Sequence, residues 1–295
     1  MNNKTFVFNE YKKESKTVLG LLEFFGIDRS VDVTLNYFDD IDTISQRVID
    51  EYNLDIKLSD LRLNASLMPD CHNSSGIQAY YYFAFIFDDL MIFKGIDYID
   101  LINGLENRKN NLPPLISEML STFMNHWKKD FKDKYTLLRT EAITWATSVN
   151  QQLQVSFNQN EYFIFKLKCH ASYLTLILMF LLRDINCTYL EYRTLQTTFE
   201  MFMFYINELA SCLREKNVGE LTSVDKLFMT NDFARITEYC VKQIYKIIKE
   251  FEGKCNLMVS LEFIRLCKNT VVVHLASDRY EKFFYEEFAL IQNRD

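Results

Sequence analysis

Apolar and polar residues recur along most of the chain with the spacing of amphipathic helices, which bury one face and expose the other. Residues 232–251 are typical, because Ile, Val and Tyr alternate there with Lys and Glu at helical spacing. No segment gives a convincing strand pattern. The helices predicted from the pattern are 17–25, 39–52, one near Leu61, 78–93, 115–127, 135–153, 162–182, 189–215, 232–251 and 257–284.

The segments between these helices are short and polar. Residues 1–16 are polar and expected to be loose, 106–114 form a polar loop, and 217–223 break the pattern. With only 7 Gly and 3 Pro, the chain has few residues that interrupt helices. We therefore predict an all-α bundle of about ten helices with an active-site cavity between them. Because no repeat, linker or composition boundary divides the sequence, 1–295 is predicted to be a single domain, although its length would allow two.

Composition and charge exclude several classes of protein. The chain has 295 residues, of which 48% are hydrophobic, enough for a large core. A net charge of −7 argues against a nucleic-acid partner, which would require a basic face. The longest apolar run, 173–182, is too short to span a bilayer, and the polar start has no signal region. We expect no membrane insertion and a cytoplasmic protein.

Cysteine and histidine give no recognisable site. The seven Cys are odd in number and include no Cys-x-x-Cys pair, so we interpret them as reduced thiols, mostly in the core. The four His are scattered and form no zinc pattern.

Three oxygen-bearing residues recur at steps of four near the middle of the chain: Asn207, Ser211 and Glu215. On a helix, such steps place all three on one narrow face. Oxygen ligands suit Mg²⁺, and Arg214 falls on the same face as Asn207. A metal-binding edge with a cation beside it would suit a diphosphate.

Two further segments have matching chemistry. An almost entirely apolar run ends in Asp88-Asp89, and Arg279-Tyr280 stand near the end of the chain. In this order, the three pieces resemble the aspartate-rich motif, the Asn-Ser-Glu motif and the diphosphate-binding Arg-Tyr pair of class I terpene synthases. His274, five residues before Arg279, makes the pattern similar to the trichodiene-synthase-like branch.

The resemblance implies a fold, a cofactor and a set of site residues. The fold would be the class I terpenoid synthase bundle, and Mg²⁺ would be the cofactor, three ions with the diphosphate, with Mn²⁺ as an alternative. The metal ligands implied are Asp88, with Asp89 in support, and Asn207, Ser211 and Glu215, and all of these except Asp89 are also the expected catalytic residues. The diphosphate-binding residues expected are Lys166, Arg214, Arg279 and Tyr280, and the cavity-lining residues are Tyr81, Phe85 and Phe204.

The chain departs from the family pattern at three places. The family has a third acidic residue two or three positions after Asp89, where this chain has Met91 and Ile92. Glu208 stands in place of the usual Asp. The family's Arg sensor upstream of the Asn-Ser-Glu motif is also missing. Lys166 is our candidate for that role, with Lys168 in reserve, although either could be a lysine that extends from a buried helix to solvent.

The aromatic candidates have a simpler alternative. The chain is 15% aromatic, and aromatic faces can stabilise a carbocation and exclude water. Tyr81, Phe85 and Phe204 lie one or two turns before metal-ligand candidates, and Trp145 and His274 are weaker candidates. Aromatic residues at helical spacing more often pack in the core.

Two acidic segments imitate metal motifs. Residues Asp39, Asp40 and Asp42 open a predicted helix, where capping and the helix dipole explain them. Asn231-Asp232 starts like a second Asn-Ser-Glu motif, but Arg235 stands where Ser is required. A helix cap is therefore preferred there.

The resemblance makes a sesquiterpene cyclase acting on farnesyl diphosphate the main functional hypothesis. A diterpene cyclase acting on geranylgeranyl diphosphate stays open, because cavity volume cannot be read from sequence. A chain-elongating prenyltransferase fits less well, because that family has two aspartate-rich motifs and no Asn-Ser-Glu set. A non-catalytic helical relative acting as an interaction protein is the alternative from another class. A prenyl diphosphate is the expected partner, and a homodimer is compatible with the resemblance.

Overall fold

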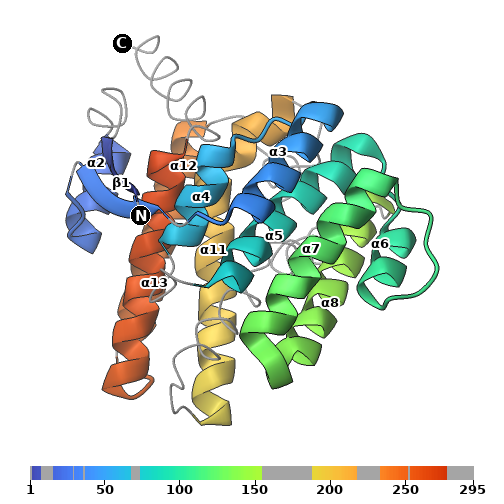
Figure 1. The fold of residues 1–295 in the computed structure, drawn as a ribbon. Helices are drawn as coiled ribbons and strands as arrows, with labels where there is room; N and C mark the ends of the chain where they lie inside the picture. Colours follow the sequence, from blue (N-terminus) through green and yellow to red (C-terminus); the bar gives the residue numbers. More distant parts are fainter. Residues whose placement is uncertain are drawn as a thin grey trace. The chain divides into compact units, whose positions relative to one another are not determined.

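The structure is a computed structural model that describes residues 2–7, 16–28, 30–35, 37–67, 74–154, 188–217, 233–251 and 253–277. The chain divides into two compact units (Figure 1). Unit 1 comprises Met1–Asn3, Thr34–Ser156 and Ile177–Arg183, and unit 2 comprises Lys4–Val33, Phe157–Leu176 and Asp184–Asp295. The single domain expected from the sequence stays a prediction.

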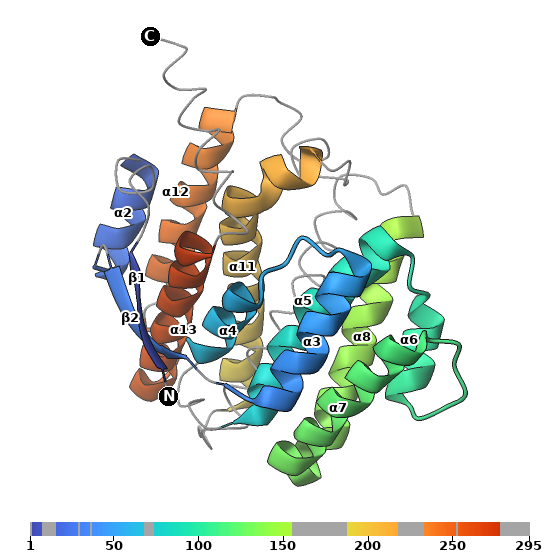
Figure 2. The same cartoon turned by 45° about the horizontal axis from the view of Figure 1, so that its top comes forward.

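Unit 1 is a helical bundle built around α5. Its elements are α3 (Asp39–Tyr52), α4 (Leu58–Ser66), α5 (Ser75–Lys94), α6 (Tyr98–Leu105), α7 (Pro114–Phe131), the 3-10 turn η1 (Lys132–Lys134) and α8 (Tyr135–Gln154). Helix α5 packs against α3, α4, α7 and α8, and α6 packs against α7 and α8 (Figure 2). This arrangement explains why the predicted helix 78–93 is almost entirely apolar, since it is covered on most sides.

Aromatic side chains fill the centre of unit 1. The Phe83 ring lies 4.9 Å from Phe87, 5.1 Å from Trp127 and 5.4 Å from Trp145, measured between centroids. All four side chains are buried. Trp145, a weaker cavity candidate from the sequence, therefore packs in this aromatic cluster.

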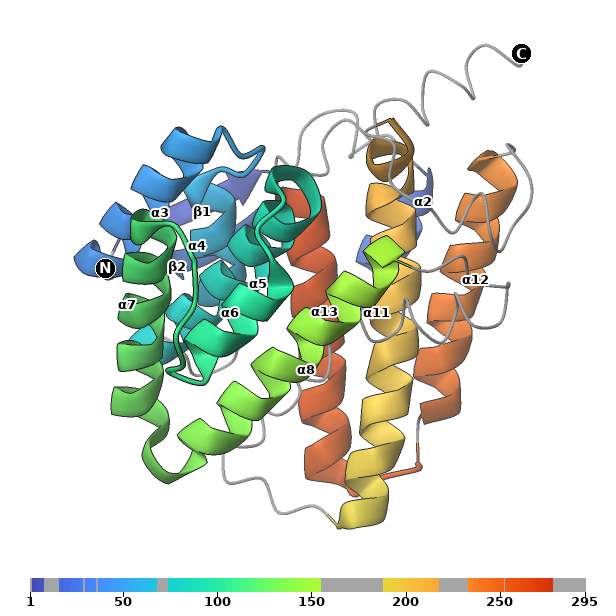
Figure 3. The same cartoon turned by 90° about the vertical axis from the view of Figure 1, so that its right-hand side faces the viewer.

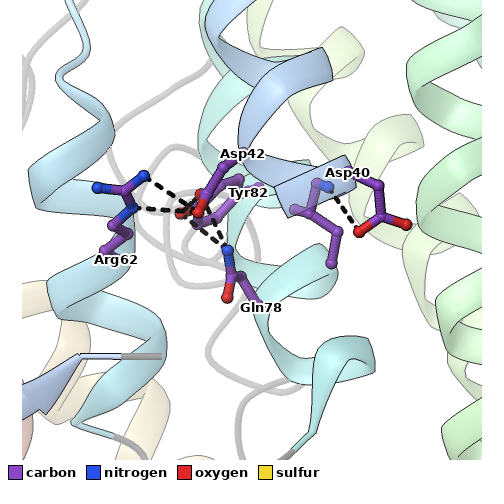
Figure 4. A network of polar contacts seen from close by, with 6 residues as sticks. Asp40, Asp42, Arg62, Gln78 and Tyr82 are labelled. Atoms are coloured by element: carbon purple, nitrogen blue, oxygen red, sulfur yellow. Dashed lines mark hydrogen bonds and ion pairs between the residues drawn. The ribbon is translucent and has the colours of Figure 1, made fainter. Parts of the chain in front are cut away.

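A buried polar network joins α3, α4 and α5 (Figure 4). One oxygen of Asp42 accepts hydrogen bonds from the Tyr82 hydroxyl at 2.6 Å and from Gln78 Nε2 at 3.0 Å. The other oxygen accepts a hydrogen bond from Arg62 Nε and lies 3.1 Å from Nη2 of the same guanidinium. Burial raises the pKa of the Asp42 carboxyl, while the hydrogen bonds from Tyr82 and Arg62 oppose that rise. Arg62 also lies over the ring of Tyr37, 4.9 Å from its centroid.

The acidic segment at 39–42 opens α3, as the sequence predicts, but it does not cap the helix. The cap position is Phe38, whose side chain makes no capping hydrogen bond. Asp40 instead accepts from Ile41 N at 3.0 Å, and its second oxygen lies 2.7 Å from His126 Nε2 on α7. Asp42 is directed inward to Arg62. The N-capping part of the interpretation is therefore wrong, whereas the three acids do lie in the first turn of α3, where the helix dipole favours them.

The start of α5 is fixed by a carboxylate from the end of α7. Asp130 Oδ2 accepts from the hydroxyls of Ser74 and Ser75 and, at 2.7 Å, from the backbone N–H of Gly76. Ser74 also caps the helix, since its hydroxyl accepts from Ile77 N at 3.3 Å. These bonds satisfy donors that a helix start leaves open.

The described residues of unit 2 form three long helices, one short helix and most of a two-stranded sheet. Its elements are β1 (Asn2–Val7), α2 (Lys16–Phe25), β2 (Ser30–Leu35), α11 (Tyr189–Asn217), α12 (Phe233–Phe251) and α13 (Leu257–Ala276). Helix α11 packs against α12 and α13, which both contact α2 (Figure 3). The ring of Phe263 on α13 lies near rings of both other long helices. Its centroid is 4.2 Å from that of Phe251 on α12 and 6.2 Å from that of Phe199 on α11.

The predicted all-α fold class is confirmed, with local corrections. Strands β1 and β2 pair where the sequence analysis expected a loose start and no strand. The apolar–polar alternation of Ser-Val-Asp-Val-Thr-Leu in β2 is the signal that was missed. Helix α6 was also missed, between two predicted helices. The predicted helix 162–182 and residues beyond 277 lie outside the described residues.

None of the helices in the described part of the chain has the length and hydropathy that a bilayer span requires. Of the cysteines, Cys240, Cys255 and Cys267 have described side chains that are free of disulfides. Burial raises the pKa of the Cys240 and Cys267 thiols, which keeps them in the neutral form.

A capping box starts α11 and ties it to the start of α13. Thr188 N and Oγ1 donate to one oxygen of Glu191 at 2.8 and 2.9 Å, and Glu191 N donates back to Thr188 Oγ1. The other Glu191 oxygen accepts from Asn256 N and Nδ2 at 2.8 and 2.9 Å. Hydrogen bonds from Thr188 and Asn256 lower the pKa of Glu191 to about 2.

This contact should make stability depend on acidity. Since the pKa of Glu191 is lower in the folded protein than in the unfolded chain, its contribution is complete above about pH 4.5 and is lost as the pH falls towards 2. We expect Glu191→Gln to lower the free energy of unfolding at pH 7, with a difference from the parent that shrinks on acidification. Urea unfolding between pH 7 and pH 3 measures this, with exposed Glu250→Gln as the control. A difference that stays constant with pH would contradict the assignment.

Candidate active site

One face of α5 is less buried than the rest of the helix. Between Ile77 and Ile92, the half-buried side chains are Tyr81, Ala84, Phe85, Asp88 and Ile92. Their spacing of three or four residues places them in one stripe, because each residue turns the helix by about 100°. The stripe therefore presents two aromatic rings, one carboxylate and small or aliphatic groups to the accessible side of the helix. It contains the two α5 residues predicted to line a cavity and the first predicted metal ligand.

The two neighbouring carboxylates of α5 have different environments. Asp88 belongs to the accessible stripe, whereas Asp89 is only 1% exposed. Asp89 is separated from Gln78 and Tyr82 by eleven and seven residues, so all three lie on one side of α5. That side carries the contacts with Asp42. Asp88 is thus the more accessible of the two carboxylates, and the roles of both in metal binding stay predictions.

The missing third acid has a visible consequence. Ile92 lies one turn after Asp88 in the same stripe, and Met91 is buried. An acidic residue at 92 would have shared the face of Asp88. The accessible face of α5 therefore becomes apolar immediately after its one carboxylate.

Helix α11 has a comparable stripe. Gln196, Glu200, Met203 and Asn207 are half-buried at helical spacing, and Ser211 continues the same line in a buried position. Ser211 Oγ donates to the Asn207 carbonyl oxygen at 2.8 Å. The hydroxyl proton is used in that bond, and a hydroxyl oxygen is in general able to accept a hydrogen bond or to bind a cation.

The remaining members of the predicted set are only partly described. Arg214 and Glu215 have their backbones in α11, and their side chains lie outside what the structure describes. Lys166, Arg279 and Tyr280 lie outside the described residues altogether. Their predicted roles stay predictions.

Three other residues discussed from the sequence are buried. Phe204 is packed against Tyr205, with ring centroids 5.0 Å apart. His274 Nδ1 lies 2.8 Å from the Thr270 carbonyl oxygen, to which it donates. Glu208, the acid that follows Asn207, is fully buried, and its charge, after burial itself, contributes to the raised pKa of Cys240 on α12. Glu208 is therefore directed towards α12.

The donors on these stripes suit a hard cation. In the described part of the chain, no three His, Cys, Asp or Glu side chains gather into a metal-binding group. A magnesium site does not require such a group. Magnesium takes few protein ligands, all of them oxygen atoms, and keeps waters or substrate phosphates in its coordination shell. A carboxylate at Asp88, and an amide and a hydroxyl one turn apart at Asn207 and Ser211, fit that requirement. The residues on α5 belong to unit 1 and those on α11 belong to unit 2. The donor chemistry of each set, taken separately, suits a magnesium ion.

Sequence reasoning named some members of each stripe and missed others. Ala84, Gln196, Glu200 and Met203 were not singled out, although all follow from helical spacing once Asp88 and Asn207 are fixed. Gln196 Nε2 donates to Glu200 Oε1 at 3.1 Å, so this part of the α11 stripe is an ordered polar surface.

Comparison of the sequence with family models and with curated proteins finds no match. Comparison of the structure with solved structures does find matches. The linalool/nerolidol synthase from Streptomyces clavuligerus superposes with a TM-score of 0.56 at 10% identity, over 82% of this chain and 96% of that chain. Isoprene synthase from leaves of grey poplar (Populus x canescens) superposes with a TM-score of 0.59 at 17% identity, over 94% of this chain.

The chain spans 60% of the length of the isoprene synthase. At these identities the likeness establishes the fold alone. The chain thus has the helical fold of the class I terpene synthases, as the three sequence motifs imply. The trichodiene-synthase-like branch stays a prediction.

Proposed function

We propose that this chain is a Mg²⁺-dependent terpene cyclase. It would ionise an allylic prenyl diphosphate, most suitably farnesyl diphosphate, cyclise the cation to a sesquiterpene, and release diphosphate. The observation that carries the proposal is the stripe on α5, where Asp88 follows Tyr81 and Phe85 on the accessible face of an otherwise buried helix. The terpene-synthase fold supports the same reading.

The polar residues would serve the departing diphosphate. Bound Mg²⁺ supplies positive charge that stabilises the leaving group as the carbon–oxygen bond breaks. Asp88, Asn207, Ser211 and Glu215 would hold the metal, and Asp89 would support Asp88. Lys166, Arg214, Arg279 and Tyr280 would donate hydrogen bonds to the phosphate oxygens, as the motif resemblance implies.

The aromatic residues would serve the hydrocarbon part of the substrate. Tyr81 and Phe85 precede Asp88 by two turns and one turn on the same stripe, so a chain that extends from the diphosphate would run along their rings. A ring face attracts a carbocation by about 0.5–2 kcal/mol. Ala84 and Ile92 offer no nucleophile, which protects a reactive cation from premature capture. Phe204, buried on α11, would add a further aromatic wall.

Turnover tests this function directly. Purified protein is incubated with Mg²⁺ and, in separate reactions, with geranyl, farnesyl and geranylgeranyl diphosphate, and volatile products are analysed by gas chromatography with mass spectrometry. We expect a cyclic sesquiterpene from farnesyl diphosphate, lost on addition of EDTA and restored by excess Mg²⁺ or Mn²⁺.

The other outcomes separate the alternatives. A cyclic product from geranylgeranyl diphosphate alone would make the chain a diterpene cyclase. A longer diphosphate would make it a prenyltransferase. Absence of turnover with every substrate and metal would overturn the proposal in favour of a non-catalytic helical relative.

A further inference from the structure

Four large aliphatic side chains stand exposed at one end of unit 2. They are Leu190 (76% exposed), Leu257 (73%), Met258 (63%) and Leu261 (56%). Among the exposed large hydrophobic residues of the described chain, Leu190, Leu257 and Met258 are the three most exposed. We call the four residues the aliphatic tip.

Hydrogen bonds hold the members of the tip together. Leu190 and Leu257 lie next to Glu191 and Asn256, whose side chains join the starts of α11 and α13 at 2.8–2.9 Å. Met258 and Leu261 extend the exposed face along the first two turns of α13. Figure 3 shows these two helix ends together at the bottom of the view. The tip is therefore one protruding surface from two helices.

Basic residues surround the tip. Arg193 lies one turn after Leu190 on α11, Arg265 one turn after Leu261 on α13, and Lys254 three residues before Leu257, and all three are exposed. Two acidic residues also adjoin the tip on these helices. Glu191 accepts four hydrogen bonds, and Glu262, mostly buried, lies 4.0 Å from Arg265. Three cations and two carboxylates therefore adjoin the tip, which leaves a small excess of positive charge around it in a chain whose net charge is −7.

We propose that the aliphatic tip docks unit 2 onto an anionic lipid surface. Aliphatic side chains that protrude beside Lys and Arg suit the boundary between headgroups and acyl chains, because the apolar groups enter the acyl region while the cations remain among the anionic headgroups. The docking is peripheral, since none of the described helices can span a bilayer.

A second copy of this chain fits the tip less well. A standard protein interface uses about 20–30 residues on each side, compared with four in the tip. A two-fold contact would also place the same surface on both subunits, which would bring Arg193, Arg265 and Lys254 towards their own counterparts. The inference does not depend on the proposed function, because it concerns binding alone.

Vesicle co-sedimentation of the full chain tests the proposal. We expect binding to vesicles of phosphatidylcholine with phosphatidylserine, weaker binding to phosphatidylcholine alone, and release by salt. The double variant Met258→Gln/Leu261→Gln should lower partitioning by about tenfold or more, since two aliphatic side chains no longer enter the lipid. Gln retains helix propensity, and circular dichroism checks the fold.

Two further double variants test whether binding depends on the tip and on its cations. Ile99→Gln/Leu137→Gln removes two exposed aliphatic side chains from unit 1 and should leave binding unchanged. Lys254→Glu/Arg265→Glu should abolish the preference for anionic vesicles. Equal loss in the unit 1 control, or no effect of the tip variant, would overturn the proposal. Concentration-dependent dimerisation that Met258→Gln/Leu261→Gln abolishes, seen by sedimentation equilibrium without lipid, would assign the tip to a second copy instead.

Discussion

Replacing Asp88 with alanine is expected to lower the rate of terpene formation by about 10²–10³-fold, the scale on which loss of one preorganised electrostatic contact slows a reaction. Asp88 is the carboxylate on the accessible stripe of α5, so its loss would remove the metal ligand that we propose for this helix. Asn207→Ala should have an effect of similar size, since Asn207 is half-buried and Ser211 is buried, and these are the two α11 candidates whose side chains the structure describes. Product formation from farnesyl diphosphate under saturating Mg²⁺ gives the rates.

The matched control is Asp133→Ala, which removes an exposed carboxylate from η1 in the same unit. It should turn over at the parent rate, and all three variants should keep the parent circular dichroism spectrum. Activity of Asp88→Ala equal to that of Asp133→Ala would rule out the metal-binding role of Asp88. Raising the Mg²⁺ concentration adds a second measurement, because a lost ligand should increase the Mg²⁺ concentration needed for half-maximal rate.

Replacing Arg62 with alanine is expected to lower the free energy of unfolding by about 3 kcal/mol, the lower end of the cost of removing one partner from a buried ion pair. The Asp42 side chain is 4% exposed, and without the guanidinium its burial is no longer offset by an ion pair. The lower end applies because the Arg62 side chain is 27% exposed and because Tyr82 and Gln78 still donate to Asp42. Urea unfolding at pH 7 measures the loss.

The double variant Asp42→Asn/Arg62→Met is the informative comparison. Removing both charges together should cost clearly less than Arg62→Ala, because no uncompensated charge stays buried. Tyr82→Phe, which removes one hydrogen-bond donor to Asp42, should cost about 1–2 kcal/mol. If Arg62→Ala and the double variant were equally destabilised, the pair would not act as a coupled unit.

Local pattern was sufficient to predict the main helices. The predicted helix 39–52 coincides with α3, and the predicted helices 189–215 and 232–251 agree with α11 and α12 to within two residues at either end. The stripe of Tyr81, Phe85 and Asp88 was also accessible to sequence reasoning, because helical spacing alone determines which residues share a face. Apolar content predicted that α5 would be buried, and most of its side chains are.

Contacts between distant segments were not predictable in the same way. Asp42 looked like a helix-start acid, and only the packing of α3 against α4 and α5 shows that it pairs with Arg62. The different environments of Asp88 and Asp89 depend on which side of α5 its neighbours cover. Strand β1 became a strand through pairing with β2, a partner more than twenty residues away. The intrinsic β propensity of a segment has little predictive weight where pairing with a distant segment determines whether a strand forms.

The half-buried stripe of α5 makes this helix easy to diversify. Exchanges at Tyr81, Ala84, Phe85 and Ile92 alter what a ligand meets, yet leave the fully covered residues such as Phe83 and Phe87 in place. Partly covered positions generally tolerate replacement at a smaller loss of stability than core positions do. Under the proposed function, exchanges at these four positions would change the product spectrum while the scaffold that carries Asp88 stays the same.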